Sequence, residues 1–144
     1  MATPYTTIYV SFLNKVSDQY LANMSDIDLN LQMLKYLNSS VPKFKKCKKD
    51  LSLRSVDGLG FTEDLTDEEV EILANLMVIE WLRPQVNSLE LLKQSMGSKD
   101  FNLYSQANHL KELQTLRKDA QSEISKLLVD YSYNNNSLDD LYDD

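Results

Sequence analysis

Two long runs of apolar residues at helical spacing, both in the second half of the chain, constrain the fold more than any other feature of this sequence. The first run follows a capping box, in which Thr66 can accept the N–H of Glu69 while the Glu69 side chain reaches back to the cap. Its expected buried face consists of Val70, Leu73, Ala74, Met77 and Trp81. Pro84 lacks a backbone donor, so residues 68–96 are predicted as one kinked helix or as two abutting helices.

The second run predicts the longest helix, over residues 105–131, which at about 1.5 Å per residue would span roughly 40 Å. That length exceeds what packing against the other predicted helices requires. The expected inward side chains are Leu110, Leu113, Leu116, Ala120, Ile124, Leu127 and Leu128.

Two shorter helices are predicted before these runs. The first begins with Thr3 as its cap and Pro4 at its first helical position. Its apolar stripe is Ile8, Phe12, Val16 and Tyr20. The second begins at Ser25, with Asp28 three residues later in a capping arrangement, and ends near Asn38. Its expected inward side chains are Ile27, Leu31, Leu34 and Leu37.

Residues 39–63 lose the helical spacing and are predicted as a long loop or arm, which holds five of the fifteen cations between Lys43 and Lys49. The 144 residues include only three Gly and three Pro, too few turn formers for a β-sandwich or barrel. We therefore predict an all-α fold, a bundle of about four to five helices with a long C-terminal helix. Residues 1–133 form the single predicted domain, and residues 134–144 form an extended acidic tail.

Charge and composition exclude several classes of function. A net charge of −7 disfavours sequence-independent DNA binding, which needs a basic surface. No apolar run reaches the roughly 18 residues of a membrane span, and the first residues lack a signal-peptide pattern, so we expect an intracellular protein without membrane association. One Cys and one His argue against disulfides and a zinc site, and no phosphate loop or nucleophile motif occurs. We expect no enzyme activity, no cofactor and no metal.

Several single residues admit both a structural and a functional interpretation. His109 is expected to be a half-buried structural histidine rather than a ligand. Cys47 lies among lysines that would lower its pKa and make it reactive, although an incidental thiol in a surface loop is the favoured interpretation. Trp81 is expected in the core, and Glu71 and Glu80 on the polar side of their helix.

The charged segments are the candidate interaction sites. The loop is either simply solvated or contacts phosphates, an acidic partner or another copy of this chain. The candidate contact residues are Lys43, Phe44, Lys45, Lys46, Arg54 and Arg83. The tail is either a frayed terminus or a docking segment whose apolar side chains fill pockets while its aspartates meet basic residues. Its candidate docking residues are Leu138, Asp139, Asp140, Leu141 and Tyr142.

Two stretches of the chain resemble small helical proteins encoded by tailed phages. The first begins Asp64-Leu65-Thr66-Asp67-Glu68-Glu69 and runs on to Glu80-Trp81-Leu82-Arg83-Pro84. The second is Gly97-Ser98-Lys99-Asp100-Phe101, followed by Ser105-Gln106-Ala107-Asn108-His109-Leu110 at the start of the long helix. The family is the head–tail connector, or adaptor, proteins that sit beneath the portal. The likeness covers about residues 60–130 and depends on element order and helix length rather than on a diagnostic motif.

The resemblance implies a structural virion protein without enzyme activity. Adaptors of this kind form a ring, commonly of twelve copies, on the portal protein, where they extend the DNA channel and dock the next neck or tail protein. The tail from residue 134 would reach the portal, and DNA would pass without sequence-specific binding, as suits a negatively charged chain. The expected location is the neck of the virion, assembled in the host cytoplasm.

Two alternatives stay open at this point. A cytoplasmic helical regulatory protein would use the same tail and loop to bind a single protein partner without forming a ring. A nucleic-acid regulator would use the lysines of residues 43–49 with Arg54, although the net charge of −7 counts against it. Copy number distinguishes a ring from a regulator, and steeply salt-dependent DNA binding would mark the third class.

Overall fold

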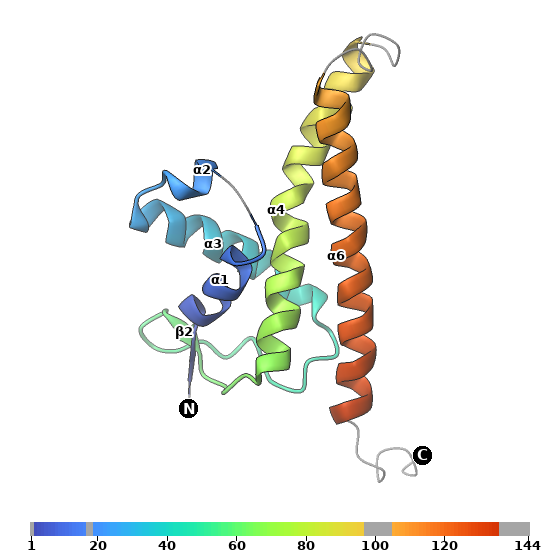
Figure 1. Ribbon diagram of the computed structural model, residues 1–144. Coiled ribbons are helices and arrows are strands. Elements are labelled where there is room, and N and C mark those ends of the chain that lie inside the picture. The colour runs from blue at the N-terminus through green and yellow to red at the C-terminus, as the bar shows by residue number, and fades with distance from the viewer. Residues whose placement is uncertain (1, 17–18, 97–104, 136–144) are drawn as a thin grey trace.

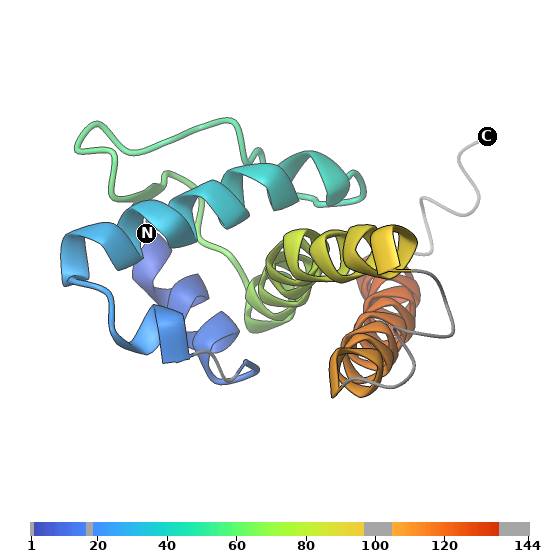
Figure 2. The same ribbon diagram turned by 90° about the horizontal axis from the view of Figure 1, so that it is seen from above.

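The computed structural model describes residues 2–16, 19–96 and 105–135, and these are mostly helical, which confirms the predicted all-α class (Figure 1). The elements are β1 (Thr3–Pro4), α1 (Tyr5–Leu13), α2 (Gln19–Ala22), α3 (Asp26–Ser40), the 3₁₀ turn η1 (Val41–Lys43), β2 (Gly60–Phe61), α4 (Asp67–Met96) and α6 (Ser105–Asn135). Helices α4 and α6 form a long antiparallel hairpin, while α1 and α3 pack on the other side of α4 (Figures 1 and 2).

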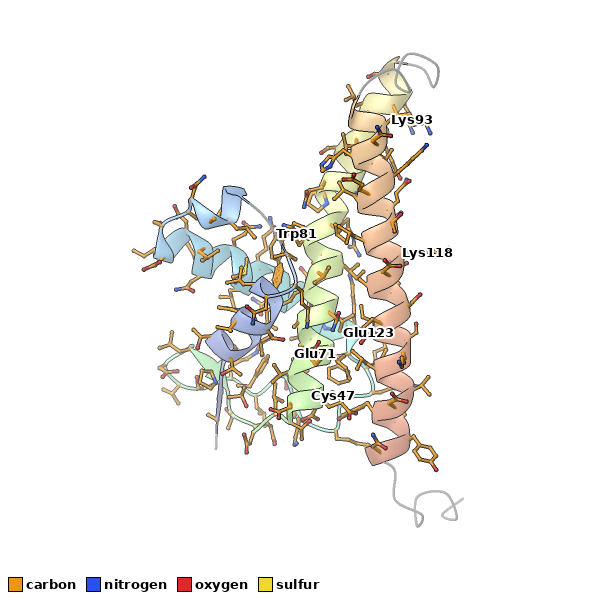
Figure 3. The ribbon with its side chains drawn as sticks, viewed as in Figure 1. Cys47, Glu71, Trp81, Lys93, Lys118 and Glu123 are labelled. Atoms are coloured by element: carbon orange, nitrogen blue, oxygen red, sulfur yellow. The ribbon has the colours of Figure 1, made fainter. Side chains whose placement is uncertain are left out.

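The capping box at the start of α4 forms as predicted. Thr66 Oγ1 accepts the Glu69 N–H at 3.2 Å, and Glu69 Oε1 accepts the Thr66 N–H at 2.8 Å. Pro84 lies inside α4, which runs as one helix of 30 residues, so the alternative of two abutting helices is wrong. Trp81 is buried as predicted and extends from α4 toward α1 and α3 (Figure 3), where it meets the Phe12 ring edge-on at 6.4 Å.

Helix α6 is longer than predicted, because it continues to Asn135 and so includes two residues assigned to the tail. Most of its predicted inward side chains are buried or partly buried. They are Leu110, Leu113, Ala120, Ile124, Leu127 and Leu128. Leu116 is instead exposed, which corrects its assignment to the core. A helix that packs mainly against one neighbour buries only a narrow stripe, and Leu116 lies outside it.

The first predicted helix begins later and ends earlier than expected. Thr3 is not its cap, because the residue is extended in β1 opposite Phe61 and its hydroxyl accepts the Leu65 N–H at 2.8 Å. Pro4 therefore precedes the first helical turn instead of forming it. Helix α1 ends at Leu13, so the stripe from Ile8 to Tyr20 does not belong to one helix.

Helix α3 begins as predicted, with the Ser25 side chain accepting the Asp28 N–H at 3.2 Å. Leu37 is buried, and Met33 joins it in the core. Ile27 and Leu31 are exposed, which corrects their predicted inward positions. The reason is tertiary, since the buried face of α3 is the one that packs on α4. Local sequence thus places the bounds of this helix to within about two residues, but it does not give the orientation of the helix.

The segment between α3 and α4 is folded against the core rather than extended as an arm. Leu51, Phe61 and Leu65 are buried, and β2 pairs antiparallel with β1. The chain passes so close to Thr3 that a Cβ at Gly60 would lie 2.5 Å from the Thr3 carbonyl oxygen. This part of the loop is therefore part of the fold.

Replacing Gly60 with alanine should lower the free energy of unfolding by about 1–3 kcal/mol, because the Thr3 backbone would have to move. Chemical denaturation measures the loss. The matched control is Gly58→Asn, since Gly58 has φ +73° with open space around it and asparagine tolerates that conformation. Equal stability of the Gly60→Ala variant and the unmodified protein would contradict the close approach of β1 and β2.

Candidate functional site

A buried polar network joins the start of α4, the end of α6 and residues 43–49, which we call the lysine-rich loop. At its centre is Glu69, whose side chain is 1% exposed. One carboxylate oxygen accepts the Tyr131 hydroxyl at 2.6 Å, and the other accepts Lys49 Nζ at 3.2 Å. Tyr131 Oη in turn accepts the Lys48 N–H at 2.7 Å, and Cys47 Sγ lies 3.7 Å from Glu69 Oε2. We call these five residues the Glu69 network.

The pKa values in the Glu69 network point to a structural role. Burial alone would raise the pKa of the Glu69 carboxyl, but the hydrogen bonds it accepts, that from Tyr131 foremost, hold this pKa below its ordinary value. Burial and the bond to Glu69 raise the pKa of the Tyr131 hydroxyl. A carboxylate with a lowered pKa and both oxygens occupied by donors is poorly suited to general base catalysis. The arrangement instead ties three segments together.

Cys47 belongs to this network as a half-buried thiol beside the start of α4 (Figure 3). Burial raises the pKa of the Cys47 thiol, and the Glu69 charge raises it further. Hydrogen bonds from the Lys49 backbone and from Tyr131 lower this pKa by less, so it stays raised, contrary to the alternative of a lysine-activated, reactive cysteine. The side chain packs against the hydrophobic core, and its thiol stays protonated at neutral pH.

The cations of the loop are partly used within the fold. Lys43 forms an ion pair with Glu80, and the Arg83 guanidinium lies 3.5 Å from the same carboxylate. Glu80 is buried, which corrects its predicted position on the polar side of α4. Lys45 and Lys46 are exposed, and Lys43 and Arg83 are exposed as well despite their contacts with Glu80, so a partner could reach all four.

Phe44 and Arg54, also predicted as contact residues, serve the fold in this structure. Phe44 is 3% exposed and meets the Tyr131 ring edge-on at 5.3 Å, so its side chain is not available to a partner. Arg54 donates to the Tyr5 hydroxyl at 2.8 Å, and its guanidinium stands 4.6 Å above the centre of the Phe61 ring.

His109 is exposed on α6, which corrects its predicted half-buried position, because Ala107, Leu110 and Leu113 take the buried positions of this helix segment. It borders a shallow pocket with α4 residues between Pro84 and Leu89. The predicted docking residues of the tail lie outside the described residues. They are Leu138, Asp139, Asp140, Leu141 and Tyr142.

One surface feature was missed by the sequence analysis. An apolar groove of about 480 Å³ lies between α1, α3 and the loop that leads into β2. Three of its residues are large and exposed, with Ile27 at 75%, Leu31 at 63% and Leu59 at 68%. We call it the α1–α3 groove. A usable signal was present, since α3 carries more apolar residues than one helix face can bury, but sequence alone assigned Ile27 and Leu31 to the core.

Comparison with protein-family models, curated proteins and solved structures found no match to this chain. Within the part of the chain that the structure describes, no three His, Cys, Asp or Glu side chains gather in a way that could hold a metal ion. Among the same residues, no helix combines the length and apolarity needed to cross a membrane. The function is therefore argued from the site itself.

Replacing Tyr131 with phenylalanine should lower the free energy of unfolding by about 1–3 kcal/mol, because it deprives buried Glu69 of a hydrogen bond. The lowered pKa of Glu69 stabilises the fold above the carboxyl's ordinary pKa of 4.5, and this contribution is lost as the pH falls through the folded-state value. The difference between the two proteins should therefore shrink below pH 4.5. Denaturant titrations across pH measure it. Tyr133→Phe, at an exposed position of the same helix, is the control, and an equal loss there would contradict the network.

The Cys47 thiol should react with a disulfide reagent at neutral pH at least about tenfold more slowly in the native protein than in denaturant, because its raised pKa suppresses the thiolate. Absorbance of the released thiol gives both rates. The denatured chain is the control for the intrinsic reactivity of this cysteine. Native labelling as fast as labelling of the denatured chain would show that the thiol is neither buried nor protonated.

Proposed function

We propose that this chain is a subunit of a phage head–tail connector, a ring of copies bound beneath the portal protein that extends the DNA channel and docks the next neck or tail component. The observation that carries the proposal is the part of the α4–α6 hairpin that projects beyond α1 and α3 (Figure 1). We call it the projecting arm, residues 87–96 of α4 with the start of α6 beside them. Val86 is the last fully buried residue of α4 before it.

The projecting arm has features of a surface that neighbouring copies would cover. Its two helices support each other, and Gln114 Nε2 donates to Glu90 Oε1 at 3.3 Å across them. Leu91 is nevertheless exposed on α4, and Leu116 is exposed a little further along α6. Apolar side chains on an extended two-helix segment favour burial against another molecule. A contact between different surfaces of identical copies closes into a ring when its rotation allows.

The sequence resemblance and the charge support the same proposal. Of the stretches that resemble connector proteins, residues 67–84 lie in the first part of α4 and residues 105–110 at the start of α6, the two helices of the hairpin. A net charge of −7 suits a channel from which DNA must be released. The exposed Lys45, Lys46 and Arg83 remain candidates for contact with a neighbouring subunit or neck protein. Docking of residues 138–142 on the portal remains a prediction from sequence.

A regulator that binds one protein partner is the second candidate, and the α1–α3 groove is the observation that favours it. Such a protein needs one apolar site and no closed ring. The nucleic-acid regulator is less favoured, because Lys43 and Lys49 each face a carboxylate on α4 and the surface around them is partly neutralised.

Native mass spectrometry of the chain with the portal protein from the same genome tests the connector proposal. We expect a complex with about one copy per portal subunit. Leu91→Asp should weaken this assembly more than tenfold without changing the melting temperature, because it places a charge on an exposed position of the projecting arm. Leu53→Asp, at an exposed position in the loop, is the matched control and should assemble normally.

Two results would contradict the proposal. A chain that stays monomeric or dimeric and does not bind the portal would favour the single-partner regulator. Normal assembly of the Leu91→Asp variant would leave the ring possible but would remove the projecting arm from its contacts, and with it the observation that carries the proposal.

A further inference from the structure

The α1–α3 groove is an apolar feature of the surface that the proposed function does not use. Its walls come from α1, through Tyr5 and Tyr9, and from α3, through Ile27 and Leu31, with Leu59 closing one side. Exposed leucine and isoleucine side chains that gather around one concavity usually mark a binding site, whereas single exposed apolar side chains scattered over a surface do not. No charged side chain lines the groove, so its occupant must present apolar groups.

Two cations flank the groove without a carboxylate partner among residues 2–16, 19–96 and 105–135. Arg54 donates to the Tyr5 hydroxyl at the groove wall and otherwise contacts Asn38 and the Phe61 ring. Lys35 lies on α3 one turn beyond Leu31, and both border an adjoining hollow. An occupant with apolar anchors and negative charges beside them would therefore complement both the groove and its rim.

The chain itself contains one segment of this composition, residues 136–144, which follow directly on the end of α6. It reads Asn136-Ser137-Leu138-Asp139-Asp140-Leu141-Tyr142-Asp143-Asp144, with three apolar anchors and four aspartates. Its anchors are spaced i, i+3 and i+4, so a helical turn formed on binding would present all three to one groove. The stretch of residues 63–72 is more acidic still, but its apolar side chains Leu65, Val70 and Ile72 are buried in the core and so are already used by the fold.

The short reach of the segment favours a second copy, rather than the same chain, as its donor. Leu138 comes three residues after Asn135, where α6 ends, so it lies within about 10 Å of that end. Helix α4, about 10 Å across with its side chains, stands between α6 and the elements of the groove (Figures 1 and 2). A neighbouring copy is free of this constraint.

We infer that the α1–α3 groove binds the C-terminal segment of a neighbouring copy of this chain, with Leu138, Leu141 and Tyr142 in the groove and the aspartates facing Arg54 and Lys35. The inference deepens the connector proposal, on which its closure into a ring rests, by naming the contact between adjacent subunits. It also assigns the tail to the next subunit instead of to the portal. Because groove and tail are different surfaces, each copy both donates and accepts a segment.

Two variants with complementary defects test this contact. Leu31→Asp damages the groove at an exposed position and keeps the tail, whereas deletion of residues 136–144 removes the tail and keeps the groove. By sedimentation velocity, each variant alone should be monomeric at concentrations where the unmodified chain associates. Mixed together they should form a one-to-one dimer and nothing larger, because only one groove and one tail remain. Leu31→Met keeps an apolar wall and should associate like the unmodified chain.

Three outcomes would overturn the inference. The mixture stays monomeric, the Leu31→Asp variant associates normally, or the unmodified chain is monomeric at every concentration because its tail occupies its own groove. Portal binding, measured separately, distinguishes this inference from the proposed function. A tail-deleted chain that still binds the portal supports the assignment of the tail to a neighbour. Formation of the mixed dimer without any portal binding would instead remove the connector proposal and leave the tail–groove contact in place.

Discussion

The hydrogen bond from Tyr131 to buried Glu69 is the contact on which the base of this molecule depends. The two residues are 62 positions apart, one in the first turn of α4 and the other near the end of α6. A carboxylate removed from water is costly unless donors surround it, and here the donors come from three separate segments. Each segment therefore holds the other two in place. The capping box of α4 shares the same carboxylate, so the start of the helix and the closure of the hairpin are one structural unit.

The conformation of the lysine-rich loop depends on the same buried carboxylates of α4. Its aromatic side chain, Phe44, packs beneath α6, and two of its lysines meet the carboxylates of Glu69 and Glu80 on α4. A segment with five cations among seven residues appears from sequence to be a solvated or partner-binding arm. Its conformation depends on where two acidic side chains lie. Glu69 follows Lys49 by 20 positions, and Glu80 follows Lys43 by 37. No local pattern reports on that placement.

The same distinction explains which predictions succeeded. The caps at Ser25 and Thr66 were predictable because each depends on residues within one helical turn. Thr3 was assigned wrongly because its partners, Phe61 and Leu65, are about 60 residues away. The α1–α3 groove escaped prediction for a related reason: an exposed apolar stripe and a buried one have identical spacing, and only the orientation of α3 against α4 separates them. The candidate tail was visible in sequence, but the groove that we propose it binds was not.

Pro84 makes α4 easier to bend at one point, although the helix is continuous there. Proline has no N–H, so the Glu80 carbonyl one turn earlier lacks its usual helical partner. The missing hydrogen bond lies close to Val86, where α4 leaves the core and the projecting arm begins. Bending α4 there breaks fewer hydrogen bonds than bending it anywhere else along its length. A bend of α4 at this point would change the direction of the projecting arm and leave the buried base of the molecule as it is.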